Sequence, residues 1–163
     1  MILLVLQCSI RPYTLTDRSL LITTINAVCA EGRWMRTRCY EPTPAWEHAL
    51  AEPDCSCHLL LIVVDEERVV GWCRVFRDAD SQTGADIAIG LLPEYREQGI
   101  GTALFQQAMV WTSKNGLARL HLTTRVDNAR AIRLFQKFGF AVVRELDENW
   151  LEMATCPLIG EIT

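Results

Sequence analysis

The sequence predicts an α/β (α+β) domain with one mixed, mostly antiparallel sheet in a single layer and helices on both of its faces. Segments in which apolar residues alternate, as in strands, are interleaved with segments that repeat every ~3.6 residues, as in helices. A strand–helix–strand unit in the middle predicts two parallel neighbours, with hairpins on both sides. The 163 residues, 50% of them hydrophobic, suit a single domain over residues 1–163, with a core from about residue 10 to 156.

The first third of the chain predicts one strand and two helices. The apolar run Ile2–Arg11 is typical of a strand, and Pro12 ends it. Thr16 and Asp17 are good cap residues, and a helix is expected to follow them to about Ala30, because its apolar residues fall at helical spacing. After an irregular stretch, a short helix is expected over Thr43–Glu52, with a threonine cap and a proline at the first helical position.

The rest of the chain predicts six strands and two helices. Polar turns separate the strands, which span Leu59–Val64, Val69–Arg77, Ala85–Leu92, Arg119–Val126, Phe140–Glu145 and Trp150–Cys156. One amphipathic helix runs from Gly99 to about Asn115, and another runs from Asp127 or Asn128 to Phe138. A glycine follows each of these helices, as is common at helix ends. The predicted order is β-α-α-β-β-β-α-β-α-β-β.

Charge and hydropathy disfavour two classes of partner. Sixteen basic and twenty acidic residues give a formal net charge of −4, so no basic field favours nucleic acid. No apolar run reaches the ~18 residues of a membrane span. The first residues lack the basic leader and cleavage site of a secretory signal. We therefore expect a cytoplasmic protein that binds neither nucleic acid nor membrane.

The cysteines bear on redox state and on metal binding. Seven of them, an odd number, are scattered through apolar segments, which favours free thiols in a reducing compartment. The run Cys55-Ser56-Cys57-His58 invites a zinc interpretation, but no second pair at similar spacing completes a four-ligand site. We therefore expect no metal, with a metal protein kept as an alternative.

One segment carries the chemistry. The strand that ends at Leu92 is followed by Pro93 and a charged turn, and Gly99 and Gly101 then open a helix. The first amides of a helix lack internal partners and lie at its positive end, so this turn is suited to a pyrophosphate, with Arg96 as an added cation. The alternative is that both glycines serve only a tight turn and close helix packing. A dinucleotide fingerprint lacks its third glycine, and a P-loop lacks its Gly-Lys-Ser/Thr.

Two motifs in the expected order carry a family resemblance. Arg96-x-x-Gly99-x-Gly101, after a strand that ends in Leu-Pro, resembles the acyl-CoA signature of the GNAT superfamily of N-acyltransferases. A second block downstream, Asn128-x-x-Ala131-Ile132-x-Leu134-Phe135-x-x-Phe138-Gly139-Phe140, is similar to that family as well. The resemblance covers about residues 10 to 156. It implies the acyl-CoA N-acyltransferase fold and acetyl-CoA as co-substrate.

The resemblance also implies where the cofactor lies. A bulge is expected to splay the strand at 85–92 away from the strand at 119–126, and the pantetheine arm would lie in this gap. The expected contacts of that arm are Ile89, Gly90 and Leu91, and the Leu91 N–H would polarise the thioester carbonyl. Asn128 would contact the pantetheine or only cap its helix. Phe135 would pack beside the cofactor. The amides that would hold the pyrophosphate belong to Glu97, Gln98, Gly99, Ile100, Gly101 and Thr102.

The expected reaction is direct attack of a neutral primary amine on the acetyl carbon in a ternary complex. It needs a base for the amine proton, and an acid can protonate the leaving thiolate. Many members of the family carry Tyr at the Phe135 position as that acid, and some carry Glu at the Thr123 position as the base. This chain departs from both patterns. The remaining base candidates are Asp86 and His121, which alternatively are a solvated strand-end charge and a half-buried structural histidine.

The acceptor side is less defined. In the resembled family the loop between the first two helices lines the acceptor pocket, which here points to Glu31, Arg33 and Trp34. Glu31 could pair with a cationic amine, and the arginines with an acidic acceptor. A solvated loop is the plainer interpretation. The acceptor is expected to be a small-molecule or peptide amine, and homodimers are common in the family. The rival function is a non-catalytic acyl-CoA-binding sensor or subunit.

Overall fold

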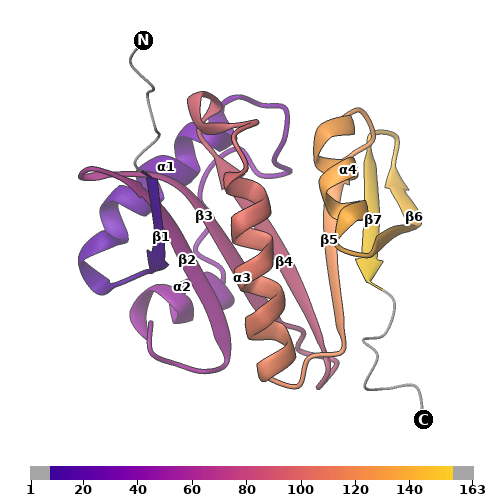
Figure 1. Ribbon diagram of the computed structural model, residues 1–163, viewed down its shortest axis with the longest axis horizontal. Coiled ribbons are helices and arrows are strands. Elements are labelled where there is room, and N and C mark those ends of the chain that lie inside the picture. Colours follow the sequence, from indigo (N-terminus) through magenta and orange to yellow (C-terminus); the bar gives the residue numbers. More distant parts are fainter. Residues whose placement is uncertain (1–7, 156–163) are drawn as a thin grey trace.

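A computed structural model describes residues 8–155. Its seven strands form one sheet in the order β1-β2-β3-β4-β5-β7-β6, in which β4 and β5 are parallel and every other neighbouring pair is antiparallel (Figure 1). The strands are β1 (Cys8–Pro12), β2 (His58–Asp65), β3 (Arg68–Arg77), β4 (Gly84–Leu91), β5 (Arg119–Arg125), β6 (Phe140–Asp147) and β7 (Trp150–Thr155). The helices are α1 (Arg18–Ala30), α2 (Pro44–Ala51), α3 (Ile100–Lys114) and α4 (Ala129–Lys137).

The sheet is buried on both faces, because successive side chains of its central strands enter different cores. On one face, Leu60 and Ile62 of β2 join Trp72 of β3 and pack against α1 and α2. On the other face, Leu61 and Val63 of β2 pack with residues of α3. Figure 1 shows α3 lying in front of the sheet. The predicted mixed sheet with helices on both faces is confirmed.

The element order agrees with the prediction, and two short 3₁₀ turns are added. These are Leu15–Asp17 and Pro93–Tyr95. The first helix starts at Arg18 with Asp17, one of the two predicted cap residues, at its N-cap position, and the Asp17 carboxylate accepts from the Thr14 N–H and the Arg11 guanidinium. The first strand is described from Cys8 onward, and the rest of its predicted span lies outside the described residues.

The expected bulge in the fourth strand is wrong. The β3–β4 register runs one to one from Arg77↔Ala85 to Gly71↔Leu91, with no shift. The strands β4 and β5 nevertheless diverge, because they pair only over Gly84–Asp86, while β5 keeps β7 on its opposite edge up to Arg125↔Trp150. The gap that the bulge was expected to open therefore forms where the β4–β5 pairing stops.

The expectation of free thiols is wrong for two cysteines, because Cys55 and Cys57 form a disulfide. Four other cysteines in the described part are free: Cys8, Cys29, Cys39 and Cys73. Burial raises the pKa of the Cys73 thiol to about 12, which keeps it a neutral apolar group. Cys156 lies outside the described residues. Among residues 8–155, the helices are too short or too polar to cross a membrane.

Candidate active site

The divergence of β4 and β5 opens a cavity of about 620 Å³ in the middle of the sheet. Figure 1 shows the two strands meeting at one end and separating toward the other. Residues 87–91 of β4 line one wall, and residues 122–124 of β5 line the opposite wall. A strand edge without a partner leaves N–H and C=O groups free for a ligand. The cavity can therefore take an extended amide-bearing molecule as a substitute for the missing strand.

The backbone of Leu91 faces this gap. The Leu92 N–H donates to the Val70 carbonyl of β3 at 2.9 Å. Because N–H groups alternate in direction along a strand, the N–H groups of Leu91 and Ile89 point to the other side, toward β5. Gly90 lies between them under the Trp72 ring, where an added Cβ would overlap the indole. Glycine at this position thus lets the Trp72 ring pack directly on the β4 backbone.

The turn before α3 presents a set of free amides. Glu97 and Gly99 have φ values of 61° and 86°, so two residues of this turn have positive φ, in the left-handed region, before the helix begins. Across the described chain, the N–H groups of residues 97–102 have no hydrogen-bond acceptor. They lie at the positive end of a 15-residue helix. Gly99, Gly101 and Thr102 also line the cavity. This cradle is suited to the pyrophosphate that the sequence predicts.

The Arg96 side chain lines the cavity and also makes structural hydrogen bonds and an ion pair. Its guanidinium donates to the Leu91 carbonyl at 2.9 and 3.1 Å and pairs with both Glu31 carboxylate oxygens at 2.5 and 2.9 Å. It thereby ties the end of β4 to the end of α1. The second cation at the cradle is Arg130, which lines the cavity and lies 3.2 Å from the Glu97 carboxylate. Sequence reasoning missed Arg130, although it stands within the second motif.

Asn128 and Phe135 bring α4 to the cavity. The Asn128 side-chain oxygen accepts from the Ala131 N–H at 3.3 Å, so the residue caps α4, and it also lines the cavity. Phe135 lines the cavity as well, and its ring centroid lies 5.4 Å from that of Phe105. Its ring offers packing and no titratable proton. A Cβ on Gly101 would lie 3.2 Å from Leu134, so the glycine permits the close approach of α3 and α4.

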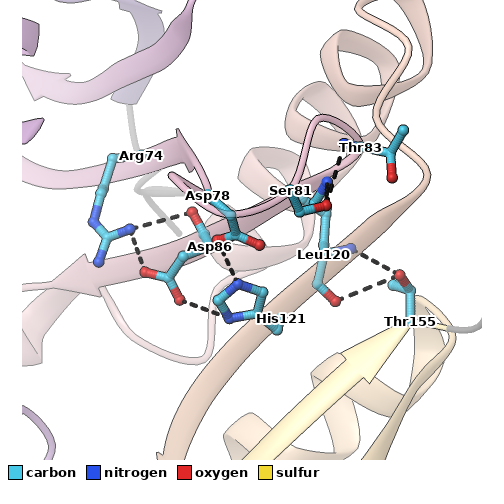
Figure 2. A network of polar contacts seen from close by, with 9 residues as sticks. Arg74, Asp78, Ser81, Thr83, Asp86, Leu120, His121 and Thr155 are labelled. Atoms are coloured by element: carbon cyan, nitrogen blue, oxygen red, sulfur yellow. Dashed lines mark hydrogen bonds and ion pairs between the residues drawn. The ribbon is translucent and has the colours of Figure 1, made fainter.

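Asp86 and His121 belong to one polar network (Figure 2). The Asp86 carboxylate pairs with Arg74 at 2.5 Å and lines the cavity. The His121 ring lies between two carboxylates, with Nδ1 3.5 Å from Asp86 and Nε2 2.7 Å from Asp78. Figure 2 shows Asp78 reaching this ring from the loop after β3. The structure thus joins both base candidates and adds Asp78, which no sequence pattern marked because it lies 43 residues from His121.

The far end of the cavity is aromatic. Of the three predicted acceptor residues, Trp34 lines it, whereas Arg33 stacks on Trp34 at 4.3 Å and lies 3.7 Å from Asp127. Glu31 is paired with Arg96 as described above. The role of these residues toward an acceptor stays a prediction. Further aromatic lining comes from Tyr40, Trp46, Trp72, Phe76 and Trp150, of which sequence reasoning missed the first four.

A loop and a hairpin close this aromatic end. Arg36, from the loop between α1 and α2, pairs with Asp147 of β6 at 3.0 Å. Its guanidinium also lies 5.5 Å from the Trp150 ring centroid. From the same loop, the Tyr40 hydroxyl donates to Glu47 of α2 at 2.7 Å, and burial together with this carboxylate raises the pKa of Tyr40. The aromatic end is therefore built from segments that are far apart in the sequence.

Solved structures share this fold. A GNAT-family acetyltransferase from Streptococcus pneumoniae superposes with a TM-score of 0.78 at 21% identity, covering 91% of this chain and 98% of that one. The structure of yncA from Salmonella typhimurium with its cofactor acetyl-CoA also gives 0.78, at 15% identity, with 96% of each chain covered. At these identities the similarity establishes the fold.

Curated relatives match over shorter segments. A mycothiol acetyltransferase of Jonesia denitrificans is 31% identical over 84 residues, which are 52% of this chain and 27% of that protein. The ribosomal protein bS18-alanine N-acetyltransferase of Escherichia coli K12 is 39% identical over 61 residues, which are 37% of this chain and 40% of that protein. The chain thus matches less than half the length of either relative. The family model of the acetyltransferase (GNAT) family matches residues 22–140. Because that is most of the chain, the protein belongs to the GNAT acetyltransferase family.

Proposed function

We propose that the protein moves an acetyl group from acetyl-CoA to a primary amine by direct attack in a ternary complex. The observation that carries the proposal is the orientation of the unpaired Leu91 N–H into the gap between β4 and β5, with the amides of residues 97–102 following it. The gap accommodates the pantetheine arm along Ile89, and the cradle accommodates the pyrophosphate. The related yncA structure contains acetyl-CoA, and two related proteins are named for acetyl transfer.

The chain's own groups supply the chemistry as follows. The amine nitrogen attacks the thioester carbon, and the developing oxyanion accepts from the Leu91 N–H. The carbon–sulfur bond then breaks and CoA leaves as a thiolate. Asp86 lies five residues before Leu91 on β4, about 16 Å along the strand, so it accepts the amine proton through a chain of waters in the cavity. His121 relays that proton to Asp78, whose carboxylate lies 2.7 Å from Nε2. Phe135 donates no proton, so the thiolate is protonated from solvent.

The acceptor binds at the aromatic end of the cavity. Trp34, Tyr40, Trp46 and Phe76 offer ring faces and edges there, and these suit an amine carried on an apolar or aromatic body, or a peptide N-terminus. Asp86, the register partner of Phe76, is an acidic group that the amine meets within this lining. We extend the proposal to a cytoplasmic protein, and to a homodimer that forms through the outer edge of β6, which pairs with no further strand among residues 8–155 and where Val142 and Val143 are exposed.

A second candidate is a GNAT-fold domain that binds acyl-CoA without turnover. Phe135 and Thr123 favour it, because they stand where other members of the family carry an acid or a base. The two functions differ in one measurable quantity, which is the amine-dependent release of CoA.

The first test is thermal unfolding with acetyl-CoA, with NADH as the control nucleotide. At about 100 times its Kd, a ligand adds roughly 2.7 kcal/mol to the free energy of unfolding. We expect a clear rise in Tm with acetyl-CoA alone, followed by CoA release with an amine panel that includes aromatic amines and short peptides. No rise at millimolar acetyl-CoA would reject acyl-CoA binding. Binding without CoA release from any amine would favour the non-catalytic domain.

A further inference from the structure

A second cluster of reactive side chains lies at the start of β2. His48 comes from α2, Cys55 and Cys57 from the following loop, and His58 is the first residue of the strand. One ligand atom from each of the four lies within 4.8 Å of every other. The His48 Nε2 is 3.2 Å from the Cys57 sulfur, and that sulfur is 3.4 Å from the His58 Nδ1. The acetyl-transfer chemistry uses none of these residues.

Two sulfur and two imidazole donors are the donor set of a structural zinc site. In a tetrahedral site, Zn–S and Zn–N bonds of about 2.3 and 2.0–2.1 Å place sulfur and nitrogen about 3.6 Å apart. The two sulfur–nitrogen distances from Cys57, 3.2 Å to His48 and 3.4 Å to His58, are close to that value. The His58 ring is buried, with 7% of the residue exposed, and within residues 8–155 its Nε2 has no hydrogen-bond partner. The other ring nitrogen, Nδ1, faces the Cys57 sulfur at 3.4 Å, so it is the atom of this buried ring that a cation in the cluster would bind.

We propose that the reduced protein binds one Zn²⁺ through His48, Cys55, Cys57 and His58. In the structure the two sulfurs are joined as a disulfide, so binding requires prior reduction. A dithiol supplies two electrons and two protons, the S–S bond breaks, and the dithiol leaves as its own disulfide. The two cysteine thiols then release two protons, and their thiolates bind the ion together with two neutral imidazoles. The ion stays Zn²⁺ throughout.

The site would fix the position of α2. His48 shares this helix with Trp46, whose ring lies edge-on at 5.2 Å from Phe76. Phe76 is in turn the β3 register partner of His58. A metal bound by both His48 and His58 would therefore link α2 to β2. The same two histidines are already connected through Trp46 and Phe76, which line the cavity. Sequence patterns did not predict a four-ligand site, because the fourth ligand is His48, seven residues before Cys55, and not a residue of a second Cys–Cys pair.

The test uses the full chain without a histidine tag, reduced with excess dithiothreitol and exchanged into metal-free buffer without oxygen. Zinc uptake is titrated against a colorimetric chelator, and Co²⁺ serves as a spectroscopic probe. We expect one equivalent of zinc per chain and a higher Tm on binding. The Co²⁺ form should show intense tetrahedral d–d absorption and a thiolate-to-cobalt charge-transfer band. None of these readouts depends on acetyl-CoA or on turnover.

Variants assign the ligands. Cys55→Ser and His48→Gln should weaken zinc binding by at least about tenfold and remove or weaken the charge-transfer band. Cys39→Ser, at an exposed free cysteine outside the cluster, should keep full stoichiometry. Where a variant does not fold, the absorption spectrum of the wild-type Co²⁺ form still tests whether thiolates bind the metal. Each of the following would overturn the proposal: a pair that stays oxidised in excess dithiol, no zinc uptake by the reduced chain, an octahedral cobalt spectrum without a thiolate band, or equal loss of binding in Cys39→Ser.

Discussion

Asp86 and His121 face each other where β4 and β5 still pair, with 3.5 Å between the carboxylate oxygen and Nδ1. They are register partners across the parallel pair, so the sheet itself holds them together. One residue further along, the strands separate and the cavity begins. The proposed base therefore lies at the closed end of the gap, where the backbone is most constrained and a reacting group can be held in a fixed position.

Asp86→Asn should lower kcat by about 10²–10⁴-fold and leave the KM for acetyl-CoA nearly unchanged. Asparagine keeps the shape of the side chain but cannot take the amine proton. Steady-state CoA release measures both constants, with thermal unfolding as a check that the fold is intact. The control is Asp80→Asn, at an exposed aspartate of the polar loop, which should behave like the wild type. Turnover that survives Asp86→Asn would exclude this residue as the base.

His121→Gln and Asp78→Asn should each reduce kcat by about tenfold, and the double variant should lose no more than either single one. Residues that act as one relay are non-additive, because removing either member interrupts the same proton path. A double-mutant cycle on kcat measures this coupling. Additive losses would mean that the two residues act separately, and the contact of 2.7 Å between them would then be structural.

Gly99→Ala should raise the KM for acetyl-CoA about tenfold with little change in kcat. The residue has φ 86°, and alanine there costs about 1 kcal/mol and turns the amides of residues 97–102 away from a common centre. S-acetylpantetheine lacks the pyrophosphate, so its own KM should not respond to the substitution. An equal rise for both donors would show that the cradle does not hold the pyrophosphate.

Local patterns predicted the strand–turn–helix cradle and the cap of α4, because neighbours in sequence make those contacts. Contacts between distant segments were missed. Arg96 binds Glu31 from 65 residues away, and nothing in the sequence marked that pair. The predicted bulge failed for a related reason, because the gap depends on where the pairing of β4 with β5 stops, and these strands are far apart in the sequence. His48 joins the cysteine cluster only once α2 packs beside β2.

Asp17→Asn should reduce the free energy of unfolding at pH 7 by roughly 2 kcal/mol and flatten its dependence on acid pH. The Arg11 guanidinium, together with the Thr14 N–H and hydroxyl, lowers the pKa of the buried Asp17 carboxyl from 3.8 to about 2. Since the folded-state pKa lies below the unfolded one, this stabilisation is complete above pH 3.8 and is lost as the pH falls through about 2. Urea unfolding at several pH values measures the effect.

The pH dependence separates this ion pair from a simple packing defect. If the charge of Asp17 is what stabilises the fold, the wild type and Asp17→Asn should converge as the pH falls from 4 to 2, because protonation then removes the same interaction that the substitution removed. Asp80→Asn is the matched control, since Asp80 is exposed and has no ion-pair partner within residues 8–155. It should leave the curve unchanged. A difference between wild type and Asp17→Asn that stays constant down to pH 2 would assign the loss to packing and not to the Arg11–Asp17 pair.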